Sequence, residues 1–164
     1  MEIRLAKDKD CAEIARLHRA TIRHINSKDY PKKIIEAWSG RTNAKRFRDS
    51  LSKCKRWVAV ENGKIAGFVD HGRSDELWGL YVHRDYIGKG LGSKLLKIAE
   101  DSLKKQGAKT IKIESTITAR PFYEKHGYKF VKKGLHPVFG DKKNGLFVDT
   151  YIMNKNLLKG SRLG

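Results

Sequence analysis

Residues 81–93 read YVHRDYIGKGLGS and join an apolar segment to an expected helix. Glycine occupies every second position from Gly88 to Gly92, which lets the backbone approach a ligand closely. The segment that follows carries its apolar residues on one helical face and leaves free N–H groups in its first turn. A glycine-rich loop before a helix N-terminus is typical of an anion-binding site. The same loop could equally cap a helix for structural reasons, so alone it identifies no ligand.

Two familiar phosphate-binding motifs do not fit this loop. A Walker loop needs Gly-Lys-Ser/Thr after a four-residue gap, and residues 81–93 lack it. A dinucleotide fingerprint expects G-x-x-G spacing at the first strand–helix unit of a domain. Here the glycines alternate, and several expected strands precede them. The loop therefore predicts an anion site of another kind.

The rest of the pattern predicts a single mixed α/β or α+β domain. Asn62-Gly63 is a strong hairpin signal, and Gly79 inside a strand suggests a bulge or a close backbone approach. The expected strands are 3–5, 57–60, 65–69, 77–82, 110–115, 128–131 and 147–153, the last two joined by a long basic loop. The expected helices are one with apolar positions from Ile14 to Ile25, one beginning near Pro31, and 44–51, 90–106 and 119–126.

Composition narrows the class of protein. The chain has 164 residues and a net charge of +18. That length suits one core, and no apolar run is long enough to span a bilayer or to resemble a signal peptide. We expect a cytoplasmic protein without a membrane partner. Cys11 and Cys54 are expected to be unpaired, and no Cys-His spacing predicts a metal site.

The positive charge attracts polyanions, nucleic acid among them. The lysines and arginines are spread along the chain and are not gathered in one arm or helix. We therefore favour a solvated basic surface over a dedicated nucleic-acid site.

A second motif, TITARPFYEKHGY at residues 116–128, follows the glycine loop. Together with residues 87–92 (IGKGLG) it resembles the GNAT superfamily of acetyl-CoA-dependent N-acetyltransferases. The order of elements agrees with that family from Ile3 to Met153. The segment 31–38, with its Ala37-Trp38 pair, is similar to a subgroup of small bacterial members related to YafP. Ile87 and Thr116 depart from the family pattern, which expects Arg or Gln and Asn there, so their contacts with coenzyme A are in question.

The resemblance implies a fold and a domain plan. The expected fold is α/β, or α+β by some schemes. Its central sheet is mixed but mostly antiparallel, has six to seven strands and about four flanking helices, and splays between the fourth and fifth strands. Residues 1–156 would form one N-acetyltransferase domain, and residues 157–164 a loose C-terminal tail.

The resemblance also implies an activity, namely transfer of the acetyl group from acetyl-CoA to a primary amine by direct attack in a ternary complex. The pyrophosphate would be held by the N–H groups of Gly88, Lys89, Gly90, Leu91, Gly92 and Ser93. The pantetheine arm would pair with the strand edge at Leu80, Tyr81 and Val82, with Thr116 nearby. The N–H of Val82 would stabilise the oxyanion.

Catalytic roles follow from the same resemblance. Tyr123 matches the general acid that protonates the leaving thiolate, although a tyrosine there could also be a core residue. Glu76 is the candidate base, directly or through water, with Asp75 and His71 as alternatives. The expected acceptor pocket contains Tyr30, Trp38 and His71, with core packing as the alternative role of Trp38.

The acceptor stays open at this stage. We expect a small-molecule or peptide amine, and we keep two alternatives. One is a protein N-acetyltransferase; the other is a non-catalytic module that binds nucleic acid or senses acyl-CoA. A homodimer would be in keeping with the family.

Overall fold

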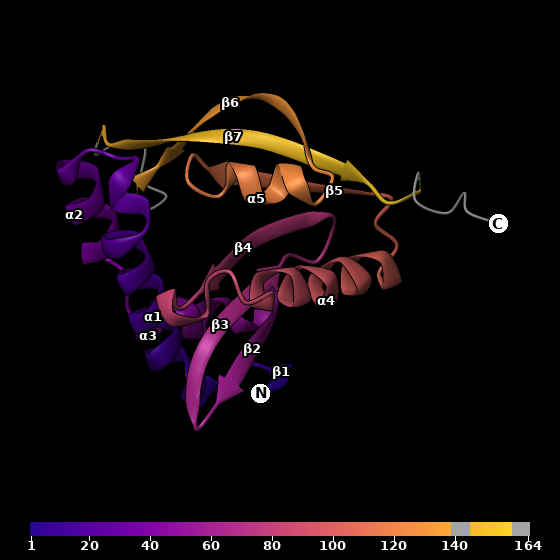
Figure 1. Ribbon diagram of the computed structural model, residues 1–164, viewed down its shortest axis with the longest axis horizontal. Coiled ribbons are helices and arrows are strands. Elements are labelled where there is room, and N and C mark those ends of the chain that lie inside the picture. Colours follow the sequence, from indigo (N-terminus) through magenta and orange to yellow (C-terminus); the bar gives the residue numbers. More distant parts are fainter. Residues whose placement is uncertain (139–144, 159–164) are drawn as a thin grey trace.

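The computed structural model describes residues 1–138 and 145–158 (Figure 1). Within them, the strands form one seven-stranded sheet. The strands are β1 (Glu2–Leu5), β2 (Lys55–Glu61), β3 (Lys64–His71), β4 (Glu76–Val82), β5 (Thr110–Thr116), β6 (Lys129–Pro137) and β7 (Phe147–Asn156). The helices are α1 (Cys11–His24), α2 (Lys32–Gly40), α3 (Ala44–Ser50), α4 (Leu91–Lys105) and α5 (Arg120–Lys125).

The strand order is β1-β2-β3-β4-β5-β7-β6, and every neighbouring pair is antiparallel except β4 and β5. These two parallel strands pair only at Glu76–Lys112 and Leu77–Ile113, and then diverge. Figure 1 shows the two arms of the sheet separating, with α1 and α2 along the wide side. The expected mixed, mostly antiparallel sheet with a splay between its fourth and fifth strands is confirmed. The described residues contain five helices where we expected about four.

A bulge in β4 lies next to this splay. Asp70 faces Gly79 and His71 faces Leu77, which leaves Trp78 as the extra residue. A Cβ at position 79 would lie 2.8 Å from the ring of Tyr81, so a side chain there would displace that ring. Gly79 is thus beside a bulge, as its place in an apolar strand predicted, and the close neighbour at this position is a side-chain ring and not backbone.

Helices cover both faces of the sheet and leave the splay between them. The larger core packs α4 and α5 against one face, around Leu95, Leu96 and Ile113. A second core packs α1 and α3 against the other face, around Ile14 and Phe68. A third, at the wide side of the splay, joins the end of α1 and α2 to Val138, just after β6, and to β7. Hydrophobic cores therefore pack against both faces of the sheet and at the wide side of the splay.

Local signals in the sequence explain most boundaries. Asn62 and Gly63 both have positive φ and turn β2 into β3, as expected. Asn43 caps α3 by accepting a hydrogen bond from the N–H of Arg46. The sixth strand is longer than expected, because residues 132–137 pair with β7 instead of forming a basic loop. Exposed lysines protect an edge strand from further pairing. In the sequence the same lysines resembled a basic loop, so this part of the strand was not predicted.

After β7 the structure describes the chain as far as Leu158. Leu157, expected to begin a loose tail, donates its N–H to Lys109 and packs against the larger core. Residues 159–164 of that tail, and residues 139–144 of the basic loop, lie outside the described residues. In the described part of the chain no helix is long and apolar enough to cross a membrane, and both cysteines are free and buried.

His18 on α1 gives the fold a pH dependence. Its ring is buried between Phe47 and Tyr81, and burial lowers its pKa from 6.5 to about 3. Between those values the unfolded chain binds a proton that the folded chain does not, so stability falls as the pH falls below 6.5. We expect His18 to account for about 2 kcal/mol of lost unfolding free energy between pH 7 and pH 5.

Urea titrations of wild type and His18→Phe at both pH values measure this effect. The phenylalanine variant should lose about 2 kcal/mol less than wild type over that interval. Equal losses in the two proteins would show that another group carries the acid sensitivity.

Candidate active site

The glycine loop ends in an exposed helix N-terminus. Gly88 and Gly90 have φ of 76° and 81°, and α4 begins at Leu91. The N–H of Lys94 bonds to the carbonyl of Gly90 as the first helical hydrogen bond. The preceding N–H groups, from Leu91 to Ser93, therefore have no acceptor within the helix and are directed out of its end. This arrangement can hold a phosphate-type anion, as the alternating glycines predicted.

The edge of β4 that faces β5 has free backbone groups beyond Leu77. Tyr81 pairs with Phe68, and the N–H of His83 donates to Ala66 on β3. Peptide groups alternate along a strand, so those of Leu80 and Val82 point the other way, toward the splay. In the described part of the chain no strand pairs with that edge. It can accept an extended ligand as an additional strand.

A cavity of about 510 Å³ joins the loop to this edge. It reaches from the start of α4, along β4, to the ends of β5 and α1, and α5 closes one side. Its lining includes Leu80, Tyr81, Val82, Gly88, Gly90, Gly92, Ser93, Thr116, Phe122, Tyr123, Lys125 and His126.

A second cavity, of about 670 Å³, lies on the face of the sheet covered by α1 and α3. It is lined by charged residues from β3, β4 and β5 and by aromatic residues from the helices. The two cavities share Trp78, Gly79, Tyr81, Ile113, Glu114 and Thr116 in their walls. They therefore meet between the diverging strands, where groups bound in each can touch.

Tyr123 on α5 borders the first cavity. Its side chain is buried and its ring packs edge-on against Phe122 and Tyr128. In the described part of the chain its hydroxyl has no hydrogen-bond partner. Burial raises the pKa of Tyr123 far above its usual value, so the hydroxyl keeps its proton at neutral pH. The residue can act as a proton donor toward the cavity.

Three carboxylates, Asp70, Glu76 and Glu114, line the second cavity beside Arg46, Arg56 and Lys112. Glu114 accepts hydrogen bonds from the hydroxyl of Thr150 (2.8 Å) and lies 3.3 Å from Nδ1 of His136. Glu76 is exposed on the neighbouring strand. Asp70 is buried against Arg56, with Nη2–Oδ2 at 2.7 Å, and desolvation raises its pKa more than the guanidinium lowers it. Glu114 is in the walls of both cavities and so is close to any group that passes between them.

The structure brings most of the expected cofactor residues together, with two exceptions. The side chain of Leu91 is buried in the larger core, which leaves its backbone N–H for a ligand. Lys89 is absent from the described lining of the first cavity, and its ammonium lies 5.6 Å from the ring centroid of Tyr86. Thr116 borders both cavities, and its Oγ1 accepts the N–H of Ala119.

The expected acceptor and base residues are more scattered. Glu76 and Trp38 border the second cavity. Among the described residues around the two cavities, Tyr30 and His71 do not appear. Tyr30 donates its hydroxyl to the carbonyl of Asp149, while both ring nitrogens of His71 are bonded, to Gly72 and Ser102. Asp75 is paired with Lys112 at 3.2 Å.

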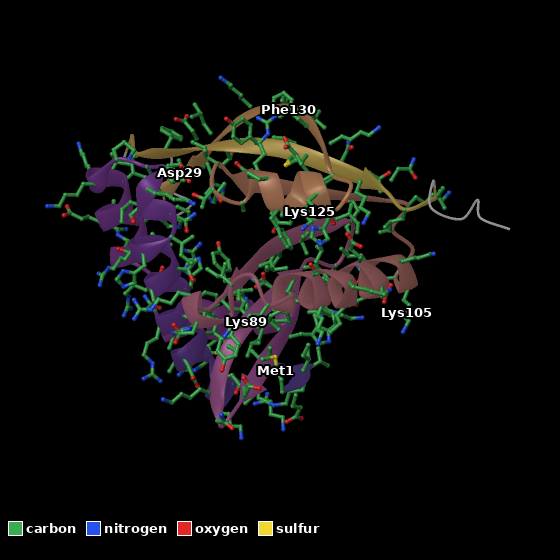
Figure 2. The ribbon with its side chains drawn as sticks, in the orientation of Figure 1. Met1, Asp29, Lys89, Lys105, Lys125 and Phe130 are labelled. Carbon is green, nitrogen blue, oxygen red and sulfur yellow. The ribbon has the colours of Figure 1, made fainter. Side chains whose placement is uncertain are left out.

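Several site residues were not predicted from the sequence. Glu114, Asn26, Lys125 and His126 all border the first cavity. Figure 2 labels Lys125 on α5 and Lys89 on the loop before α4. His126 lies 2.9 Å from the hydroxyl of Ser93 and so links α5 to the start of α4. The alternation Lys112, Glu114, Thr116 along β5 was the signal for Glu114.

Known proteins share this architecture. A model of the acetyltransferase (GNAT) domain matches residues 26–136. The uncharacterized N-acetyltransferase YafP of Escherichia coli is 27% identical over 133 residues, which are 81% of this chain and 84% of that protein.

Solved structures agree. A GCN5-related N-acetyltransferase from Rhodopseudomonas palustris superposes with a TM-score of 0.85 at 25% identity and covers 95% of each chain. The PaiA N-acetyltransferase of Thermoplasma acidophilum, solved with coenzyme A, gives a TM-score of 0.75 at 20% identity over 95% of this chain and 99% of that one. YncA of Salmonella typhimurium, solved with acetyl-CoA, gives 0.70 at 21% identity over 96% and 94%.

The matching domain model spans residues 26–136, more than half of the chain, and shows that the class is acetyltransferase. The chain belongs to the GNAT family of N-acetyltransferases. The resemblance seen in its two motifs, and in the segment related to YafP, is confirmed.

Proposed function

We propose that the protein transfers the acetyl group of acetyl-CoA, bound in the first cavity, to a primary amine bound in the second. The observation that carries this proposal is the shared wall of the two cavities between β4 and β5. A thioester that follows the edge of β4 and an amine that enters from the other face would meet there. Direct attack needs that meeting within one ternary complex.

The groups around the first cavity fit coenzyme A. Free N–H groups at the start of α4 suit its pyrophosphate, and the ammonium of Lys125 adds positive charge nearby. The free edge of β4 suits the amide-containing pantetheine arm. PaiA and YncA, which share the fold, were solved with coenzyme A and acetyl-CoA. The exposed side chain of Ile87 contributes no charge, so in this proposal the backbone and Lys125 hold the phosphates.

The reaction needs a base for the ammonium of the acceptor and an acid for the leaving thiolate. An ammonium has no lone pair, so the acceptor must first give a proton to a carboxylate, and we assign this step to Glu114. Glu76, the base expected from the sequence, would instead attract the ammonium into the second cavity. The nitrogen then forms a bond to the acetyl carbon, and the N–H of Val82 stabilises the oxyanion. The C–S bond breaks, and Tyr123 protonates the leaving thiolate. The nitrogen, still cationic after bond formation, releases its second proton to solvent, and the Tyr123 phenolate takes up a proton from solvent.

The second cavity supports a small acceptor. A volume of about 670 Å³ is in the range of sites for drug-sized molecules. Glu76 and Glu114 favour a cationic amine, and Trp38 and Trp78 offer apolar surface for its carbon chain. We therefore favour a small-molecule amine, or the amino end of a peptide, over an amine on a folded protein.

An acceptor screen tests the proposal. Thiol release from acetyl-CoA is followed with a chromogenic disulfide, and the panel contains alkyl diamines, amino acids, aminoglycosides and short peptides. At least one amine should accelerate thiol release well above the rate without acceptor, and mass spectrometry should show its mono-acetylated product. An acetyl-CoA-binding protein that acetylates no amine would contradict the proposal.

A further inference from the structure

Asn26, just after α1, has a buried carboxamide without a protein partner. Its residue is only 4% exposed and forms part of the first cavity's wall. Its Oδ1 is buried and makes no hydrogen bond within the described residues. Leaving one buried acceptor unpaired costs about 1–3 kcal/mol. Such a group is normally retained only where something else satisfies it.

A second unpaired polar atom lies in the same wall. The hydroxyl of Thr118, between β5 and α5, is buried and has no partner. The segments that carry the two groups are tied together by Tyr30, whose hydroxyl donates to Asp149 and accepts the N–H of Ile117. Among the described residues, Asn26 Oδ1 and Thr118 Oγ1 are the side-chain nitrogen or oxygen atoms that are themselves buried and lack a partner, and both residues border the first cavity. This coincidence points to a ligand.

The edge of β4 can form hydrogen bonds with only some of the amide groups in an extended chain. Peptide-like groups in such a chain point alternately to its two sides, so those that face away from Leu80 and Val82 need partners on another wall. Asn26 stands on a different wall, at the end of α1. A carboxamide offers both a donor and an acceptor and so complements a secondary amide.

We propose that the carboxamide of Asn26, supported by the hydroxyl of Thr118, hydrogen-bonds an amide of the pantetheine arm of coenzyme A. This assignment rests on the proposed function, because it presumes that the first cavity holds coenzyme A. It names a binding residue on α1, outside both sequence motifs. It also makes the ends of α1 and α5 a second clamp on the arm, opposite the β4 edge.

Calorimetric titration of Asn26→Leu with two ligands tests the assignment. Leucine keeps the volume but offers no hydrogen bond. The dissociation constant for coenzyme A should rise about 10-fold, the equivalent of one lost hydrogen bond to a polar partner. That for adenosine 3′,5′-bisphosphate, which lacks the arm, should stay within about twofold of wild type. The ligand-free variant should unfold at the same or a higher temperature than wild type, because an unsatisfied polar group has been removed.

The matched control is Asn154→Leu, a half-buried residue on β7 that is absent from the described lining of both cavities. It should bind both ligands as wild type does. Unchanged affinity of Asn26→Leu for coenzyme A would overturn the assignment and would indicate that a bound water satisfies the amide. An equal loss for both ligands would also overturn it. If wild type itself fails to bind coenzyme A, the proposed function fails first, and the two failures are thus distinguishable.

A measurement on wild type covers the case in which the leucine variant does not fold. In ¹⁵N-labelled protein, the side-chain NH₂ signals of Asn26 should shift on addition of coenzyme A and much less on addition of adenosine 3′,5′-bisphosphate. Equal shifts with the two ligands would contradict a contact with the pantetheine arm.

Discussion

Tyr123→Phe is expected to lower kcat about 100-fold, within the usual contribution of a general acid. Burial keeps the phenol protonated, and Tyr123 borders the cavity in which the thiolate would form. The ring itself should still pack against Phe122 and Tyr128. The affinity for acetyl-CoA should therefore stay within about twofold of wild type. Steady-state kinetics with the best acceptor from the screen and calorimetry with acetyl-CoA measure the two quantities.

Tyr128→Phe is the matched control for this substitution. Tyr128 is equally buried and next to Tyr123, but its hydroxyl donates to Glu100 on α4 and is absent from the described walls of both cavities. Its loss should cost stability and leave kcat nearly unchanged. A Tyr123→Phe enzyme with wild-type kcat would remove Tyr123 from the mechanism and leave water as the proton donor.

Glu114→Gln is expected to lower kcat/KM at pH 7 by about 100-fold or more, because an alkylamine with a pKa near 10 is almost wholly protonated there. The deficit should shrink as the pH rises toward 9.5, since the acceptor then loses its proton without help. Glu76→Gln should mainly raise KM, because Glu76 attracts the ammonium but lies further along its strand from the shared wall.

The pair of variants separates the two carboxylates. If Glu76→Gln loses kcat with a deficit that narrows at high pH, and Glu114→Gln does not, then Glu76 is the base, as the family resemblance first indicated. Circular dichroism and thermal unfolding of both variants show whether the loss of the hydrogen bond from Thr150 to Glu114 disturbs the sheet.

The local parts of the fold could be predicted from the sequence. Asn62 and Gly63 predicted the hairpin, and the spacing of Leu91, Leu95 and Leu96 predicted α4. Both signals could be recognised because turn geometry and helical periodicity depend on only a few neighbouring residues. The splay between β4 and β5 came only from the family resemblance. No residue pattern marks where two parallel strands stop pairing. In β6, charged residues on an exposed edge strand looked like a loop.

The candidate site was predictable where one segment builds it and not where several do. The glycine loop and Tyr123 lie within continuous motifs, so their spacing was informative. Glu114 and Asn26 can be recognised as site residues only from the elements that surround them in the fold. Alternation on β5 placed Glu114 on a face, but only the arrangement of α1, β4 and β7 shows that this face borders both cavities. His71 had a suitable residue type, yet its two hydrogen bonds hold it elsewhere.

The central claim is that the protein binds acetyl-CoA at the splay through the N–H groups at the start of α4 and the free edge of β4, and not through its general positive charge. With a net charge of +18, the protein could attract any polyphosphate at low salt, so the titration needs about 0.15 M salt and ATP as a comparison ligand. Calorimetry of the folded protein should show saturable 1:1 binding of acetyl-CoA with a dissociation constant below about 1 mM, at least about tenfold tighter than ATP. No detectable binding at millimolar acetyl-CoA, or equal affinity for the two ligands, would contradict the account.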